Sequence, residues 1–258
     1  MSLAHVRRGS GPTLALVHGI GSQWQMWHPV LDRVSREREI VALDLPGFGD
    51  SDEHRARPTV EALADAAAEF LDGIGFGGAH VAGNSLGGGV ALVMARNGRA
   101  RSACTLSPAG FVNHREGVYA RTVLMESRRV AKLGASHAEQ MLGGPVRRTL
   151  AFSHLVARPW RIPPDEAAGA LRNLAHSPGF ETTFEAIDDF RWTGPEPSCP
   201  VTVAWGDKDR VLIYSRQAPR ARRRLPSARH ITLTGCGHVP TWDDPEQVAR
   251  VLLEASAE

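Results

Sequence analysis

The stretch that decides the fold is Ala79–Gly88, which reads AHVAGNSLGG. Its first four residues form a short apolar run of the kind found in buried strands, and Leu86–Asn97 is small and apolar, as in a helix packed against a sheet. Between them, Gly83-Asn84-Ser85-Leu86-Gly87 matches the pattern G-x-S-x-G. Glycines on either side of the serine leave room for a sharp turn from strand to helix. The stretch therefore predicts that the Ser85 hydroxyl stands clear of its neighbours, as a nucleophile must.

Apolar runs of strand length lie on both sides of this turn. They are Thr13–Val17, Glu39–Leu45, Ser102–Leu106, Pro200–Trp205 and His230–Leu233. Helical patterns alternate with them, including Val60–Ile74 behind a Thr59 N-cap and a C-terminal helix behind Asp243 or Asp244. Strands that alternate with helices predict an α/β fold: a mostly parallel central sheet of seven or eight strands with flanking helices.

The interval 113–192 interrupts the alternation, because it contains no strand run. Its helical pieces are Tyr119–Leu133, His137–Leu142, Val146–Val156, Asp165–His176 and Phe184–Phe190. A helical insertion of this length within an α/β sheet is typical of a lid or a small second domain. We therefore expect one core domain from residues 1–112 and 193–258, with residues 113–192 as a helical lid over the carboxyl ends of the strands.

In this context the chain resembles the α/β-hydrolase fold family along essentially its whole length. The resemblance is carried, in the family's order, by His18-Gly19, Asp44–Ser51, the Ser85 turn, Trp205–Asp209 and Gly237-His238. It implies a lidded serine hydrolase, similar to esterases, whose catalytic triad is Ser85, Asp209 and His238.

The acid of this triad has two candidates, Asp207 and Asp209, which both follow a strand run. The family pattern G-x-x-D, counted from Gly206, selects Asp209 and leaves Asp207 as a turn residue that bonds nearby amides. No carboxylate stands in 106–110, where the family's other acid position lies. A histidine suits the third place because its ordinary pKa of ~6.5 lets it accept and return a proton near neutral pH.

The resemblance also implies an oxyanion hole made of two backbone N–H groups. One belongs to Leu86, directly after the nucleophile, and the other to Ile20 in the loop after the first long strand run, with Gly21 as the alternative. His18 and the stretch Asp44–Ser51 are expected to be structural.

Composition and charge exclude several other classes of function. The 258 residues carry a net charge of +2, from 30 basic and 28 acidic residues, which is too balanced for a nucleic-acid-binding or membrane-anchoring surface. No apolar stretch approaches the ~20 residues of a membrane span, and the first residues contain no signal-peptide core. The three separated cysteines have no metal-binding spacing. We expect a cytoplasmic protein that needs no cofactor and no metal and acts on a small molecule; nothing in the sequence predicts its oligomeric state.

Three functions are compatible with these motifs. The first is hydrolysis of a carboxylic ester or a related acyl bond through an acyl-enzyme. The second is cleavage of a carbon–carbon bond in an aromatic ring-fission product, because Gly83–Gly88 is also similar to the turn of those hydrolases. They usually carry a tryptophan after the catalytic histidine, where this chain has Val239, with Trp242 three residues further on. The third is a non-hydrolytic biosynthetic member of the fold. Ser85 argues against epoxide hydrolases and dehalogenases, which use an aspartate.

The substrate should be largely apolar or aromatic, because aromatic and aliphatic residues dominate the predicted lid and the loop after Ile20. An arginine that pointed inward would reverse this preference by attracting a carboxylate, and the candidates are Arg158, Arg172 and Arg191. The residues expected to bind substrate are Gly19, Gly21, Trp24, Trp160 and Val239.

Overall fold

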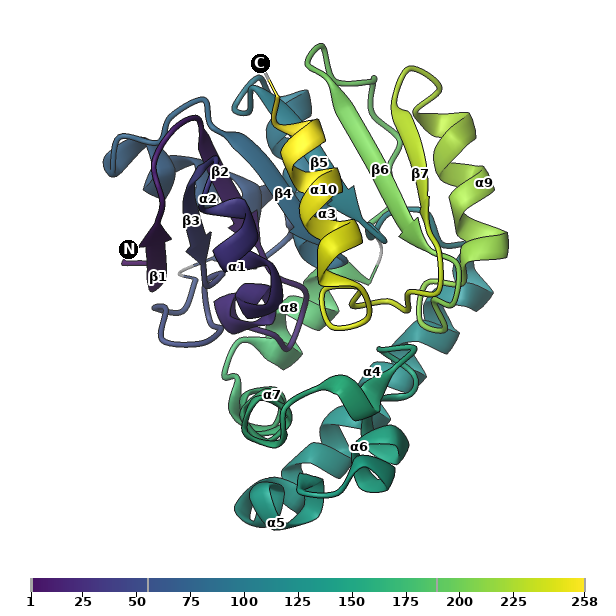
Figure 1. Cartoon of the computed structure of the whole chain (residues 1–258). Coiled ribbons are helices and arrows are strands. Elements are labelled where there is room, and N and C mark those ends of the chain that lie inside the picture. Colours follow the sequence, from purple (N-terminus) through teal and green to yellow (C-terminus); the bar gives the residue numbers. More distant parts are fainter. Residues whose placement is uncertain (1, 55, 189, 258) are drawn as a thin grey trace.

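A seven-stranded sheet forms the centre of the molecule (Figure 1). The computed structural model describes residues 2–54, 56–188 and 190–257. The strand order is β1-β3-β2-β4-β5-β6-β7, and every neighbouring pair is parallel except β1 and β3. The strands are β1 His5–Arg8, β2 Thr13–Val17, β3 Glu39–Leu43, β4 His80–Asn84, β5 Ser102–Leu106, β6 Val201–Gly206 and β7 Arg229–Leu233. The expected fold class is confirmed.

The apolar runs coincide with the central strands to within two residues. The run starting at Ala79 becomes a strand that continues through Asn84, so β4 ends directly before Ser85. Strand β1 was missed by the sequence analysis. Its four side chains are exposed or half-buried because it lies at the antiparallel edge of the sheet, so it contains no apolar run to detect.

Helices cover both faces of the sheet, as the near-continuous burial of its central strands requires. Helices α1 (His28–Val34) and α10 (Pro245–Ala255) pack on one face and share one apolar core (Figure 1). Helices α2 (Val60–Gly73), α3 (Leu86–Arg96) and α9 (Tyr214–Arg224) pack on the other. A short 3₁₀ helix, η1 (Trp24–Trp27), precedes α1.

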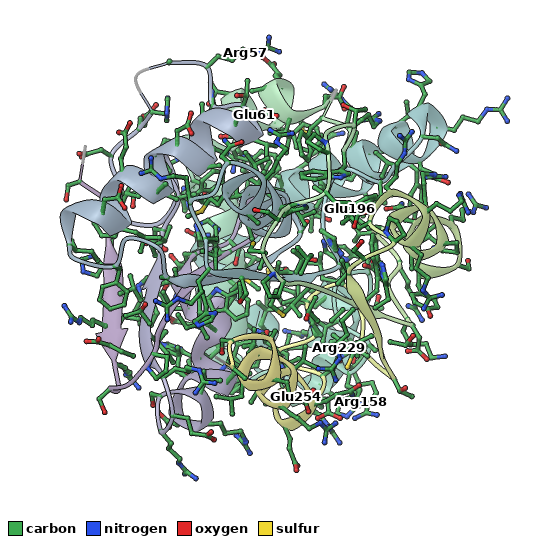
Figure 2. All side chains as sticks on the ribbon, turned by 90° about the horizontal axis from the view of Figure 1, so that it is seen from above. Arg57, Glu61, Arg158, Glu196, Arg229 and Glu254 are labelled. Atoms are coloured by element: carbon green, nitrogen blue, oxygen red, sulfur yellow. The ribbon has the colours of Figure 1, made fainter. Side chains whose placement is uncertain are left out.

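Two helix starts show how local sequence sets the element boundaries. The Thr59 side chain accepts a hydrogen bond from the Ala62 N–H and caps α2, as expected. Of the two aspartates before α10, Asp244 is the cap, because its carboxylate accepts from the Gln247 N–H at 2.9 Å. Asp243 is fully buried and has other partners. Arg229 on β7 pairs with Glu254 and ties α10 to the sheet (Figure 2).

The chain between β5 and β6, hereafter the insertion, consists of helices joined by loops and has no strand among its described residues. It lies beyond the carboxyl ends of the strands (Figure 1). Its elements are α4 His114–Gly134, η2 Ala135–His137, α5 Ala138–Leu142, α6 Pro145–Phe152, η3 Pro159–Arg161, α7 Pro164–His176 and α8 Phe180–Ile187. A small apolar core of its own includes Ala131, Leu142, Phe152, Ile162 and Leu171.

Three predicted helices of the insertion have different bounds in the structure. Helix α4 starts at His114 rather than at the predicted Tyr119, because Asn113 and Glu116 form a capping box at its start. Helix α6 ends at Phe152, and Leu155 and Val156 continue as a loop that lies against the end of the sheet. Helix α8 starts at Phe180 and ends at Ile187, before the predicted end at Phe190; position 189 lies outside the described residues.

The cysteines Cys104, Cys199 and Cys236 are free thiols, and burial raises the pKa of the Cys104 and Cys236 thiols to about 12. Within the described ranges, none of the helices combines the length and the apolar character needed to cross a membrane.

Candidate active site

Ser85 occupies a strained turn between β4 and α3. Its φ of 55° lies in the left-handed region that non-glycine residues rarely adopt. A Cβ built on Gly83 would lie 2.1 Å from the Gly87 carbonyl oxygen, and one built on Gly87 would lie 2.2 Å from the Val17 carbonyl oxygen. Both glycines are therefore required so that α3 can start immediately against β4 and β2, with the Ser85 side chain at the carboxyl end of the sheet.

This close packing predicts the effect of Gly87→Ala. The new methyl group would meet backbone oxygens of Val17 and His18, which cannot rotate away, so we expect the free energy of unfolding to fall by about 3 kcal/mol. Urea unfolding of the wild type and the variant would measure this change in the free energy of unfolding. Gly73→Ala is the matched control, because a Cβ on Gly73 meets nothing within 4 Å and alanine favours a helix. A loss below about 0.5 kcal/mol for Gly87→Ala, the range of neutral surface changes, would contradict the packing argument.

His238 and Asp209 form a buried pair beside this turn. The His238 Nδ1 lies 2.8 Å from the Asp209 Oδ2, and both residues are less than 5% exposed. The second Asp209 oxygen accepts hydrogen bonds from the Val211 and Leu212 N–H groups, each at 2.9 Å. These two bonds orient the carboxylate so that its free oxygen faces the imidazole, which places the Nδ1 proton toward Asp209 and leaves Nε2 able to accept a proton.

Asp207, the other candidate acid, lies elsewhere. Its Oδ1 accepts from the Gly235 N–H at 2.7 Å, and its second oxygen lies 3.6 Å from Lys208 Nζ. It is thus the turn residue that the G-x-x-D spacing predicts.

Asn84, directly before the serine, fixes the loop 237–242 that carries His238, hereafter the histidine loop. Its side-chain amide donates to the His238 carbonyl oxygen at 2.9 Å and to the Leu106 carbonyl oxygen at 3.0 Å. The sequence analysis assigned no role to Asn84. Its variable position in G-x-S-x-G carries no signal for a contact with a loop 154 residues away.

The loop after β2 presents the Ile20 peptide to the same region. The buried His18 ring accepts from the Leu45 N–H through Nε2 at 2.9 Å, so its Nδ1 carries a proton and donates to the Gly19 carbonyl oxygen at 2.7 Å. Burial lowers the pKa of His18 to about 4, so it stays neutral near pH 7. The Gly19 carbonyl and the Ile20 N–H belong to one planar peptide and point in opposite directions. His18 therefore sets the direction of the Ile20 N–H.

The Leu86 N–H is the other predicted oxyanion donor. Leu86 is the first residue of α3, where N–H groups have no partner within the helix. The positive end of the α3 dipole adds to the attraction for a negatively charged oxygen at this place.

Ser85 and His238 line one cavity of about 400 Å³ between the sheet and the insertion. The core contributes the loop Gly19–Gln23, Gln25, Met26 and His28, and the histidine loop contributes Val239 and Trp242. The largest apolar side chains from the insertion are Leu124, Phe152, Leu155, Val156, Ile162 and Leu174. The cavity is large enough and apolar enough to bury a small organic ester.

The residues expected to bind substrate divide into two groups. Gly19, Gly21 and Val239 line the cavity together with Ile20. Trp24 and Trp160 do not belong to the described cavity lining: the Trp24 ring packs edge-on against His28, and Trp160 is 51% exposed on the insertion. The presence of an aromatic residue in the sequence does not show whether its side chain faces the cavity or the opposite side of its helix.

None of the three candidate arginines reaches the cavity. Arg172 pairs with Glu139 on the outside of the insertion, Arg191 donates to the carbonyl oxygens of Asp188 and Phe190, and Arg158 lies at the periphery of the molecule (Figure 2). The ionisable side chains of the described lining are His28, Asp165, Glu166 and His238. His28 and Glu166 are joined at 2.6 Å. The charged residues at the cavity are thus acidic, with no lysine or arginine among them.

Two further polar residues of the insertion lie near the histidine. The Ser127 hydroxyl, which lines the cavity, donates to the Val123 carbonyl oxygen and lies 2.9 Å from the His154 Nε2. Burial and the neighbouring His238 lower the pKa of His154 to about 4. A neutral His154 therefore donates its Nε2 proton to Ser127. Sequence reasoning gave no pattern for this pair, because its members lie on different elements.

Comparison with known proteins places this geometry in a family. Residues 14–251 match the Alpha/beta hydrolase family. The chain is 26% identical to a pimeloyl-[acyl-carrier protein] methyl ester esterase of Aeromonas hydrophila, with 98% of each chain covered. It is 29% identical to an epoxide hydrolase of Mycobacterium tuberculosis, over 74% of this chain and 91% of that protein.

Among solved structures, an esterase from Thermogutta terrifontis superposes with a TM-score of 0.76 at 24% identity, covering 98% of this chain and 92% of that one. This likeness concerns the fold. Since the family match spans nearly the whole sheet, the strained serine turn and the buried histidine–aspartate pair, the chain belongs to the alpha/beta hydrolase family.

Proposed function

We propose that this protein is a serine hydrolase that cleaves a carboxylic ester of a small, largely apolar substrate through an acyl-enzyme. The observation that carries the proposal is that Ser85, on its strained turn, shares a cavity with His238, whose ring is hydrogen-bonded to the buried Asp209. The chain is also similar to an epoxide hydrolase. Epoxide hydrolases use an aspartate as the nucleophile, whereas this chain has Ser85 at that turn. Residues 113–192 serve as the lid of a core domain formed by 1–112 and 193–258.

The reaction follows from the roles of these groups. The His238 Nε2 accepts the hydroxyl proton as the Ser85 Oγ attacks the ester carbonyl carbon. Asp209 holds the ring and stabilises the imidazolium, and the Ile20 and Leu86 N–H groups bind the oxyanion. The alcohol leaves with the proton from His238. A water molecule, deprotonated by His238, then attacks the acyl carbon, and the Ser85 Oγ leaves with the proton that His238 returns to it, which gives the acid and free Ser85.

The charge of the cavity lining predicts a preference among esters. Asp165 and Glu166 are present, only Glu166 is paired with a histidine (His28), and the described lining has no lysine or arginine, so an acyl chain that ends in a carboxylate should bind poorly. We expect kcat/KM to be at least about tenfold higher for a nitrophenyl ester ending in a methyl group than for one of equal length ending in a carboxylate, which is ~1.4 kcal/mol of transition-state preference. Asp165→Asn should narrow this ratio. A ratio near one in the wild type would contradict the prediction.

The second candidate is a carbon–carbon bond hydrolase, and the observation that favours it is that Trp242 lines the same cavity as His238. Its dianionic substrates would need a lysine or an arginine at the cavity, and the described lining has neither. Both candidates are tested by incubating the pure protein with a panel of neutral esters, acyl thioesters and a dienoate diketone, with a fluorophosphonate probe as a label for the nucleophile. We expect the neutral esters to turn over fastest and the probe to label Ser85. A diketone favoured by more than about tenfold would reverse the order of the two candidates.

A further inference from the structure

Asp243 is a buried carboxylate that the triad does not use. It is fully buried in the turn between Trp242 and the α10 cap. Its Oδ2 accepts hydrogen bonds from the Gly237 N–H at 2.7 Å and the Ala157 N–H at 3.0 Å, and its Oδ1 accepts from the Arg158 N–H at 2.6 Å. One carboxylate thus holds the residue before His238 and two successive residues of the insertion.

The loop 237–239 is also held on its other side by the insertion. The Val239 N–H donates to the Leu155 carbonyl oxygen at 2.9 Å. A Cβ on Gly237 would lie 2.8 Å from that same oxygen and 2.9 Å from the Ala157 nitrogen, so the two backbones are in direct contact. The residues on both sides of His238 are therefore bonded either to the insertion or to the carboxylate that the insertion shares.

The same segment of the insertion forms part of the substrate cavity. Leu155 and Val156 line the cavity. The next two residues, Ala157 and Arg158, donate their backbone N–H groups to the Asp243 carboxylate. The Asp243 carbonyl oxygen additionally accepts from the Arg161 guanidinium at 3.1 Å. Burial raises the pKa of Asp243, while its three backbone donors oppose that shift. A buried carboxylate is costly unless it is fully bonded, so the segment and the histidine loop hold their places through it.

From these contacts we infer that Asp243 is a positioning residue that joins the cavity wall at Leu155–Arg158 to the loop carrying His238, and so keeps the imidazole aligned between Asp209 and Ser85. This inference rests on the proposed function, in which His238 is the general base. It implies that this part of the insertion stays in place during turnover. A displacement of the ring by about 1 Å would be enough to cost on the order of 10²-fold in rate.

Asp243→Asn tests the inference with little change in size. The carboxylate accepts at both oxygens, so an amide must direct its NH₂ group at one of the N–H donors and break at least one of the three bonds. We expect kcat for a neutral ester to fall by about 10²-fold with KM changed by less than about threefold. The low-field proton resonance of the His238–Asp209 hydrogen bond should weaken or shift. Asp244→Asn is the matched control, because asparagine caps a helix as well as aspartate does, and it should leave both readouts unchanged.

A second variant covers the case in which Asp243→Asn does not fold. Gly237→Ala leaves the carboxylate intact and pushes the histidine loop away from Leu155 and Ala157, so it should produce the same loss of kcat and the same change in the proton resonance. If either folded variant keeps kcat within about twofold and an unchanged resonance, the inference is overturned. The proton resonance is recorded without substrate, so it tests this inference even if the esterase proposal is wrong. Failure of the esterase proposal would be seen differently, because the wild-type protein itself would not hydrolyse esters.

Discussion

Ser85→Ala is expected to lower ester kcat by several decades, on the order of 10⁶-fold as in other triads. The alanine keeps the turn but removes the oxygen that forms the acyl-enzyme, so the remaining rate would come from the oxyanion donors and from binding alone. Steady-state kinetics with a neutral ester measures the loss. Labelling by the fluorophosphonate probe should disappear at the same time.

The control for this experiment is Ser227→Ala, which changes an exposed serine outside the cavity. It should keep the wild-type rate and the wild-type labelling. If Ser85→Ala kept more than about a hundredth of the activity, nucleophilic catalysis by Ser85 would be rejected, since even single triad losses elsewhere cost far more.

Asp209→Asn should lower kcat by about 10⁴-fold while the fold is kept. The Val211 and Leu212 N–H groups both donate to Oδ1, so the asparagine carbonyl oxygen must occupy that place. Its NH₂ group then faces the His238 Nδ1 and favours the tautomer that has its proton on Nε2. A ring protonated at Nε2 cannot accept the Ser85 proton.

Asp207→Asn is the matched control for this variant, two residues away. Its Oδ1 accepts a single backbone N–H, from Gly235, which the asparagine carbonyl oxygen can replace. We expect kcat to change by less than about tenfold, since hydrogen bonds of this kind contribute roughly 1 kcal/mol. A larger loss for Asp207→Asn than for Asp209→Asn would reverse the assignment of the acid.

Much of the core was predictable because its strands are short, apolar and bounded by glycine or proline. Parallel strands buried on both faces are made mostly of apolar and small residues, and this requirement is visible in Thr13–Val17 and Ser102–Leu106 without any knowledge of their neighbours. The same reasoning missed β1, since one edge strand can tolerate charged residues. The helices of the insertion were detected by their period, but several of their ends were displaced: the α4 start, which a capping box of Asn113 and Glu116 sets, and ends of α6 and α8.

The candidate triad could be named before the structure because a family pattern connects its three positions. The side chains that hold the triad in place had no such pattern. Asn84 contacts a loop 154 residues away, and Asp243 bonds to residues 85 and 86 positions before it. Which face of the insertion lines the cavity also escaped prediction, as the exposed Trp160 and the outward Arg172 show.

The difference between the features that could be predicted from the sequence and those that required the tertiary structure has a physical cause. Strand burial, the glycine requirement around Ser85 and the identity of the nucleophile depend on interactions within a few residues of the chain, so the order of amino acids is enough to set them. The alignment of His238, the acidic character of the cavity and the bond between the insertion and the histidine loop depend on groups far apart in sequence. Those groups meet only after the sheet has formed and its carboxyl end has been covered, where burial makes every unsatisfied polar group costly.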